Sequence, residues 1–164
     1  MNIYLLGMMG SGKSTVGRAL SRKIDKTFID LDSEIEQSFG KSISEIFEKD
    51  GEESFRHIES SKLHQYSNSV VACGGGIILN ERNRRFIKNN GKAILLKASI
   101  AELSDRLSNS RNRPLLQKKP IKETLTHLWQ DRQIHYIETA EFTVETDGKV
   151  PEIITDEILN QLNL

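Results

Sequence analysis

A glycine-rich run near the N-terminus has the residue types and the spacing of a phosphate-binding loop. Residues 7–14 follow the pattern of a glycine, four further residues and then Gly-Lys-Ser. Glycines let the backbone curl so that its N–H groups point at phosphate oxygens, and the helix expected after the loop adds its positive N-terminal end. Lys13 can reach β- and γ-phosphates, and the Ser14 hydroxyl can ligate Mg²⁺. The run therefore predicts a site for ATP and Mg²⁺.

Two acids follow the second apolar segment of the chain. Asp30 and Asp32 lie at and just beyond its end, where ligands bind in open α/β sheets. If the chain stays extended, a spacing of two puts both side chains on one side. One carboxylate could serve the metal and the other could orient and deprotonate an attacking hydroxyl. The alternative is that Asp32 caps a helix beginning near Ser33 while Asp30 is a solvated loop acid.

A third apolar run, residues 69–73, ends in glycines where many phosphate-binding folds place a metal-binding aspartate. The carboxylate for the metal must then come from elsewhere, and Asp30 is the best candidate. Gly74, Gly75 and Gly76 carry a high entropic cost, so they favour a ligand-binding backbone loop over a simple tight bend.

Basic residues later in the chain have two interpretations each. The planar fork of Arg56 or Arg132 suits a carboxylate, although each arginine taken alone is typical of a solvated surface position. Residues 110–120 are polar and basic and contain two prolines. They predict either a mobile lid that closes over ATP or a solvated linker.

Apolar runs alternate with amphipathic stretches along the whole chain. Strands are expected near residues 3–6, 27–30, 69–73, 92–96 and 142–144, and helices near 13–24, 33–66, 80–90 and 100–107 and after Pro151. The helical stretch 33–66 should break near Gly40 and Asp50-Gly51, with Ser42 and Glu45 as a capping box. The alternation indicates an α/β fold in which helices cover both faces of a parallel sheet.

Composition excludes several classes of function. The 164 residues fit one domain, and 23 basic residues balance 23 acidic ones, so no general attraction to nucleic acid or to a membrane surface is expected. The single cysteine, Cys73, excludes an internal disulfide. No apolar run is long enough to cross a bilayer, and no signal peptide is expected at the N-terminus. The expected location is the cytoplasm, and the expected state is a monomer.

Taken together, the motifs resemble those of the shikimate kinase family. The likeness runs from the first strand to about Phe142. The stretches that carry it are residues 7–15, 28–32, 46–59, 74–76, 113–116 and 132–136. The family resemblance implies a P-loop, nucleoside-monophosphate-kinase-like three-layer sandwich with a parallel sheet of about five strands. It also implies one domain over residues 1–164, with a substrate-binding helical segment at about 33–60 and the lid at about 110–120.

The resemblance implies transfer of the γ-phosphate of ATP to the 3-hydroxyl of shikimate, in chorismate biosynthesis. The implied catalytic residues are Asp32 as base, Lys13 and Arg113. The implied ATP-binding residues are Gly10, Ser11, Gly12, Lys13, Ser14, Thr15, Arg111 and Arg113. The implied shikimate-binding residues are Asp32, Phe47, Phe55, Arg56, Glu59, Gly75, Gly76 and Arg132. Ser14 and Asp30 would serve one Mg²⁺.

The chain departs from the family pattern at two places. Residues 132–136 keep the arginine and tyrosine of an Arg-x-Pro-Leu-Tyr motif but have Ile134-His135 in the middle. Cys73 stands where a small hydroxyl residue or alanine is usual, and it is expected to be a neutral buried residue. The rival interpretations are another small-molecule P-loop kinase, acting on gluconate or a nucleoside monophosphate, and a non-catalytic nucleotide-sensing module.

Overall fold

The fold is an open parallel sheet, described from a computed structural model over residues 1–108 and 120–164. The strands of this part of the chain are β1 (Asn2–Leu6), β2 (Thr27–Asp30), β3 (Ser69–Ala72), β4 (Gly91–Lys97) and β5 (Phe142–Glu145). They lie in the order β2-β3-β1-β4-β5 with every pairing parallel. The expected parallel sheet of about five strands is confirmed.

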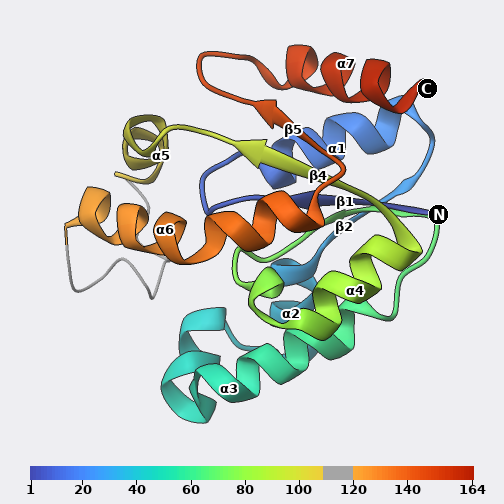
Figure 1. The fold of residues 1–164 in the computed structure, drawn as a ribbon. Helices are drawn as coiled ribbons and strands as arrows, with labels where there is room; N and C mark the ends of the chain where they lie inside the picture. Colours follow the sequence, from blue (N-terminus) through green and yellow to red (C-terminus); the bar gives the residue numbers. More distant parts are fainter. Residues whose placement is uncertain (109–119) are drawn as a thin grey trace.

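The helices alternate with the strands along the chain (Figure 1). They are α1 (Lys13–Lys23), α2 (Leu31–Phe39), α3 (Ile43–Leu63), α4 (Glu81–Asn90), α5 (Ile100–Leu107), α6 (Ile121–Thr139), α7 (Pro151–Leu162) and the short 3₁₀ helix η1 (Ile77–Leu79). None of the described helices is long and apolar enough to cross a membrane.

Two apolar clusters cover the two faces of the sheet because successive strand side chains point to opposite sides. Ile3 and Leu5 of β1 pack with residues of α1 and α7, whereas Tyr4 and Leu6 pack with residues of α4 and α6. Figure 1 shows α1 and α7 on one side of the sheet and α4 and α6 on the other. The three-layer sandwich is therefore confirmed.

The carboxyl ends of three neighbouring strands bring the sequence motifs together. The β-ladders pair Asp30 and Leu5 with the same residue, Ala72. The phosphate-binding loop after β1, Asp30 at the end of β2 and the glycine run after β3 therefore lie at one edge, where ligands bind in open α/β sheets.

Helices α2 and α3 stand at this edge with a small apolar core of their own, built on Ile35, Ile46 and Phe55. Helix α2 ends at Gly40, whose φ of 60° is the left-handed conformation that glycine tolerates. The expected capping box of Ser42 and Glu45 is present at the start of α3. Gly51 breaks α3 with φ 81° and ψ 164°, which confirms the expected interruption there.

Candidate active site

The phosphate-binding loop has the curled backbone that its glycines predict. Gly7, Gly10 and Gly12 have φ values of 144°, 80° and 93°, which are accessible mainly to glycine. Lys13 begins α1, and its Nζ donates hydrogen bonds to the carbonyl oxygens of Gly7 (3.0 Å) and Met8 (2.9 Å). The ammonium group is thereby held over the loop.

The two aspartates at the end of β2 do not lie on one extended segment, so the condition for placing both side chains on one side is not met. Asp30 ends the strand and caps α2, with its Oδ1 accepting from the Ser33 N–H at 3.4 Å. Helix α2 begins at Leu31, which places Asp32 in its first turn. Capping therefore belongs to Asp30, the reverse of the alternative considered from the sequence. The other oxygen of Asp30 accepts a hydrogen bond from the Ser14 hydroxyl at 2.5 Å.

A cavity opens beside the phosphate-binding loop and includes most of the residues expected to bind the acceptor. It contains about 580 Å³ of non-atom space, part of it open to solvent. Its lining residues are Met9, Lys13, Asp32, Ile43, Phe47, Phe55, Arg56, Glu59, Gly74, Gly75, Gly76 and Arg132. Ile43, Phe47 and Phe55 form an apolar wall, and the two phenyl rings lie 4.8 Å apart. The charged groups lie elsewhere in the same cavity.

Glu59 and Arg56 form a buried ion pair in this cavity. Arg56 Nη1 donates to Glu59 Oε2 at 2.8 Å, and its Nη2 donates to Glu52 on the same helix at 3.1 Å. Burial raises the pKa of Glu59 to about 7, although Arg56 opposes this rise. Burial by itself would lower the pKa of Arg56. The contacts with Glu59 and Glu52 have the larger combined effect, so the pKa of Arg56 is raised. Glu59 Oε1 accepts no hydrogen bond from any described residue and is available to a ligand donor.

Arg132 reaches the cavity from α6 and is only 4% exposed. The sequence alone favoured a solvated surface position for it, and that expectation is wrong. Its Nη1 donates to the Gly75 carbonyl oxygen at 3.3 Å. A buried guanidinium at a cavity wall has donors left for a planar anion such as a carboxylate.

The glycine run leaves room for the charged side chains. A Cβ at Gly74 would lie closer than 3.0 Å to Glu59 Oε1, and a Cβ at Gly76 would lie closer than 3.0 Å to the Arg56 guanidinium. A Cβ at Gly75 would meet nothing nearer than 3.6 Å. None of the three has a positive φ, so the requirement for glycine comes from close approach and not from backbone conformation.

This difference predicts unequal effects of alanine along the run. Gly74→Ala and Gly76→Ala should each raise the KM of the acceptor substrate by about tenfold or more. The added methyl group would displace Glu59 or Arg56, and such overpacking typically costs about 1–3 kcal/mol. Gly75→Ala should change this KM by less than about threefold, because its methyl group has ordinary contacts. Steady-state kinetics on the three variants measures the difference. Equal effects at all three positions would contradict it.

The raised pKa of Glu59 predicts a pH-dependent part of the stability. The folded protein holds this proton more tightly than the unfolded chain between the ordinary value of 4.5 and about 7. The free energy of unfolding should therefore fall as pH rises through this window. Between pH 5.5 and 8 the loss should be on the order of 2 kcal/mol. Urea denaturation at both pH values should show that Glu59→Gln lacks this loss, whereas the exposed control Glu81→Gln keeps it.

A second cavity adjoins the phosphate-binding loop on its other side. Its lining residues are 10–16 of the loop and α1, together with Arg106, Lys149, Pro151 and Ile154. The sequence motifs did not indicate these last four, because they come from α5, from the loop before α7 and from the start of α7, and meet the phosphate-binding loop only in the fold. Arg106 Nη1 donates to the Gly10 carbonyl oxygen at 3.1 Å, and its Nη2 donates to Thr146 at 3.1 Å.

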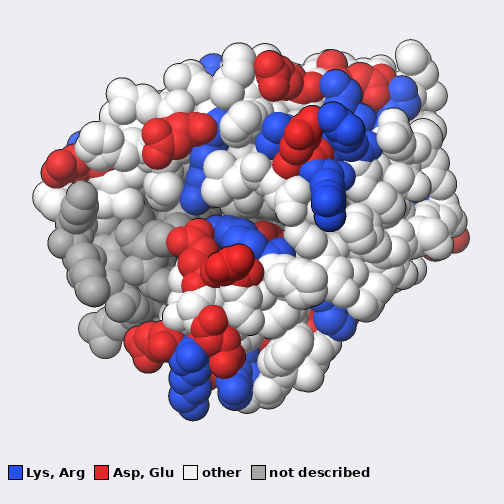
Figure 2. Space-filling model, turned by 60° about the horizontal axis from the view of Figure 1, so that its bottom comes forward, with Lys and Arg blue, Asp and Glu red and all other residues white. Residues whose placement is uncertain are grey.

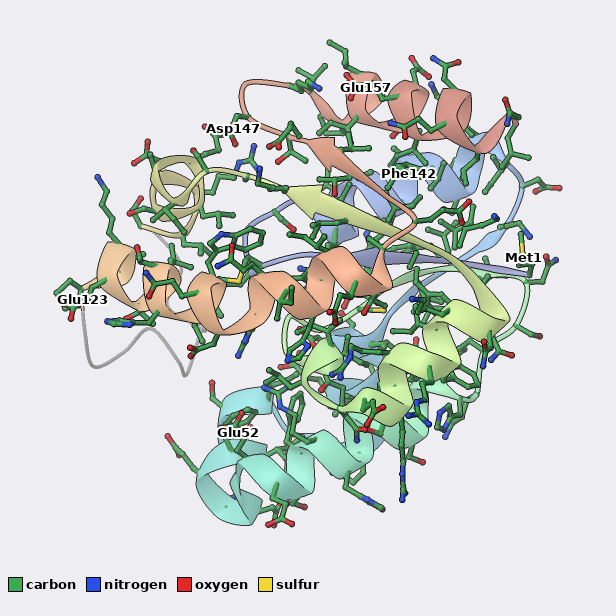
Figure 3. The ribbon with its side chains drawn as sticks, viewed as in Figure 1. Met1, Glu52, Glu123, Phe142, Asp147 and Glu157 are labelled. Carbon is green, nitrogen blue, oxygen red and sulfur yellow. The ribbon has the colours of Figure 1, made fainter. Side chains whose placement is uncertain are left out.

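The loop between β5 and α7 is fixed next to this second cavity. Asp147, labelled in Figure 3, accepts a hydrogen bond from the Ser99 N–H at 2.9 Å. A hydrogen bond with the Ser99 side chain, and this backbone contact to a smaller extent, lower the pKa of Asp147. The expected ATP residues Arg111 and Arg113, and the predicted lid, lie outside the described residues. Their roles stay predictions from the sequence.

Cys73 is buried beside the active site, and burial raises its pKa. A thiol that stays protonated is a poor nucleophile, which agrees with the expectation of a neutral packing residue. Figure 2 shows acidic and basic side chains interspersed over the face in view. Among the described residues, no group of three His, Cys, Asp or Glu side chains could hold a metal ion by itself.

Comparison with known proteins identifies the family. The family model described as shikimate kinase matches residues 9–163. The chain belongs to the shikimate kinase family. A family member from Nitrosospira multiformis is 43% identical over 166 aligned residues, which cover 99% of this chain and 85% of that protein. One from Sulfurihydrogenibium sp. is 41% identical, covering 98% of this chain and 97% of that protein.

Solved structures agree with the family assignment. The shikimate kinase of Acinetobacter baumannii in complex with shikimate matches with a TM-score of 0.96 and 38% identity, covering 99% of this chain and 92% of that one. The deoxyadenosine kinase of M. mycoides with bound dATP has a TM-score of 0.62 at 18% identity, covering 100% of both chains. The second likeness shows a common fold only.

Proposed function

We propose that this chain transfers the γ-phosphoryl group of ATP to the 3-hydroxyl of shikimate, giving shikimate 3-phosphate and ADP. The observation that carries the proposal is that Lys13 lines both cavities of the site. A nucleotide bound along the phosphate-binding loop and an acceptor in the neighbouring cavity would meet at this ammonium group. Lys13 would stabilise the charge that spreads over the transferred phosphoryl group.

The acceptor cavity suits a small ring that carries a carboxylate and hydroxyls. Arg56 and Arg132 would bind the carboxylate, and Phe47 and Phe55 would pack against the apolar part of the ring. Gluconate lacks such a ring, and a nucleoside monophosphate carries a base as well as a phosphate. The complex of a family member with shikimate supports the same choice.

Asp32 would be the catalytic base. It lines the acceptor cavity together with Lys13, which also lines the second cavity. Asp32 would accept the proton of the acceptor hydroxyl. At the same time the hydroxyl oxygen would bond to the γ-phosphorus of ATP, and the bond between that phosphorus and ADP would break. Gly75 and Gly76 would offer backbone contacts to the acceptor. Glu59 would hold Arg56 in place through their 2.8 Å hydrogen bond.

The residues present fit one Mg²⁺ that is completed by phosphate oxygens. The Ser14 hydroxyl and the Asp30 carboxylate are hard oxygen ligands in direct contact beside the phosphate-binding loop. Mg²⁺ commonly uses one or two protein oxygens together with substrate phosphates and water, so a larger protein cluster is not required. Ser14 and Asp30 would hold the ion, and the ion would neutralise phosphate charge.

Gly10, Ser11, Gly12 and Thr15 would bind the phosphates of ATP with Lys13 and Ser14. The nucleotide base would pack near Arg106 and the apolar pair Pro151 and Ile154, because these residues line the second cavity together with the phosphate-binding loop. Arg111 and Arg113 would add contacts from the lid at about residues 110–120.

A coupled ADP-release assay tests the proposal. With ATP and Mg²⁺ we expect ADP release that depends on shikimate, and none above background with gluconate or a nucleoside monophosphate. EDTA should abolish the release, and added Mg²⁺ should restore it. Release with one of the other acceptors and not with shikimate would indicate a different kinase. ATP binding without turnover on any acceptor would favour a nucleotide-sensing module.

We also propose that the enzyme acts as a monomer in the cytoplasm, where ATP is available. Activity that disappears on dilution while a dimer dissociates in light scattering would contradict the monomer.

A further inference from the structure

The hydroxyl of Tyr136 makes a contact in the active site that the proposed mechanism leaves unused. Tyr136 lies one turn after Arg132 on α6 and is fully buried. Its Oη donates to the Gly75 carbonyl oxygen at 2.5 Å, and Arg132 Nη1 donates to the same oxygen at 3.3 Å. Residues four apart on a helix share a face, so one surface of α6 supplies both donors.

The carbonyl group that Tyr136 holds determines the direction of a neighbouring N–H. The peptide between Gly75 and Gly76 is planar and trans, so its C=O and N–H point in opposite directions. A carbonyl fixed toward α6 therefore fixes the Gly76 N–H away from α6. Without such a donor, three consecutive glycines have unusual freedom to rotate this peptide.

The position of Gly75 connects this contact to the acceptor cavity. A Cβ at Gly75 would lie 3.6 Å from the Tyr136 hydroxyl, the Arg132 guanidinium and the Gly7 carbonyl oxygen alike. Gly7 also accepts a hydrogen bond from Lys13, and Gly75 lines the acceptor cavity. A rotation of the peptide after Gly75 would therefore alter the acceptor cavity beside Arg132.

The Tyr136 ring is itself held firmly. It stacks on Trp129, about two turns earlier in α6 and packed against the same apolar cluster. The ring centroids lie 6.1 Å apart, with an angle of 19° between the planes. Burial also raises the pKa of the phenol, so the hydroxyl keeps its proton and remains a donor. Both features make Tyr136 a dependable donor to Gly75.

We infer that Tyr136 is a positioning residue for the acceptor site: its hydroxyl orients the Gly75–Gly76 peptide and, with it, the carboxylate-binding Arg132. Tyr136 itself touches no reacting atom. The inference depends on the proposed function only in that it takes shikimate as the acceptor. It predicts a defect in acceptor binding that the ATP site does not share.

The test compares Tyr136→Phe with Tyr4→Phe, a matched control. Tyr4 is equally buried and its hydroxyl also has a hydrogen bond, accepted from Asn2 at 2.8 Å, but Tyr4 lines neither cavity. Tyr136→Phe should raise the shikimate KM, and the shikimate Kd from calorimetry without ATP, by about tenfold. The ATP KM should stay within about twofold for both variants, and Tyr4→Phe should leave the shikimate KM within the same range.

A spectroscopic measurement follows the hydrogen bond itself. The chain has 11 glycines, so ¹³C-carbonyl labelling of glycine gives a tractable NMR spectrum. In the unmodified protein the Gly75 signal should be shifted downfield by its hydrogen bond. Tyr136→Phe should move it upfield and Tyr4→Phe should not. An unshifted Gly75 signal in the unmodified protein would overturn the inference without any variant.

The kinetic outcomes separate this inference from the proposed function. If the unmodified protein releases ADP with shikimate and Tyr136→Phe has the same shikimate KM, the positioning role is wrong and the kinase activity stands. If Tyr136→Phe raises the ATP KM as much as the shikimate KM, its effect is general and the inference also fails. If the unmodified protein shows no shikimate-dependent turnover, the proposed function is what fails.

Discussion

Asp32→Asn should reduce kcat by about 10²–10⁴-fold with a much smaller change in either KM, because it removes a general base while keeping the size of the side chain. The asparagine amide can still accept a hydrogen bond from the acceptor hydroxyl, but it cannot take the proton. Asp32 lines the acceptor cavity with Lys13, so its loss should act mainly on the chemical step. Single-turnover kinetics with saturating ATP and shikimate measures that step.

The control for this experiment is Asp156→Asn. Asp156 is an exposed aspartate on α7 that pairs with Lys23, and it lines neither cavity. Its kcat should remain within about twofold of the unmodified protein. If Asp32→Asn retained near-normal turnover, another group would have to remove the proton, and the assignment of Asp32 would be wrong.

Arg132→Ala should raise the shikimate KM by about 10²-fold, since breaking a buried charge pair costs on the order of 2–5 kcal/mol. Its kcat should fall less, because the carboxylate is remote from the transferred phosphoryl group. Arg132 is 4% exposed, so no solvent screening weakens its contact with a bound anion. Steady-state kinetics with varied shikimate measures the change.

A ligand without the carboxylate charge shows whether the arginine acts on that group. The unmodified protein should bind the methyl ester of shikimate about 10²-fold more weakly than shikimate, whereas in Arg132→Ala this preference should be much smaller, with Arg56 accounting for what remains. Arg85→Ala provides a surface control, because this α4 side chain is 75% exposed and pairs with Glu81 on the same helix. An Arg132→Ala protein that still preferred shikimate by the same factor would exclude the proposed carboxylate contact.

The sheet and most of its helices could be predicted from local pattern alone. Short apolar runs alternating with amphipathic ones require a parallel sheet with both faces covered, and the loop at residues 7–14 follows from its glycines. The interruption near Asp50-Gly51 could be predicted in the same way, and the structure confirms it with a φ of 81° at Gly51. These features depend on residues that are close together in the sequence, so they can be predicted without knowledge of the tertiary structure.

The errors concern features that depend on tertiary contacts or on an exact helix start. The helix after β2 was expected to begin near Ser33, but it begins at Leu31 with Asp30 as its cap, so Asp32 lies in its first turn. Arg132 was expected at the surface unless the family resemblance was considered, and α6 buries it against the glycine run. Arg106 has no motif at all, because only the fold brings it to Gly10.

The glycine run illustrates what lies beyond sequence reasoning. It was expected to bring a ligand close to bare backbone. The structure adds that Gly74 and Gly76 make room for Glu59 and Arg56, which lie on a helix 15 or more residues earlier. Such a steric requirement depends on how α3 packs against the edge of the sheet, and it cannot be predicted from composition.

The side chain common to both cavities has a thermodynamic consequence. A nucleotide that draws the Lys13 ammonium toward its phosphates changes the electrostatic field that acts on the acceptor in the neighbouring cavity. Linkage then requires reciprocity: the factor by which ATP alters the dissociation constant of the acceptor equals the factor by which the acceptor alters that of ATP. Through Lys13, the binding equilibria of the two substrates are therefore coupled before any phosphoryl group is transferred.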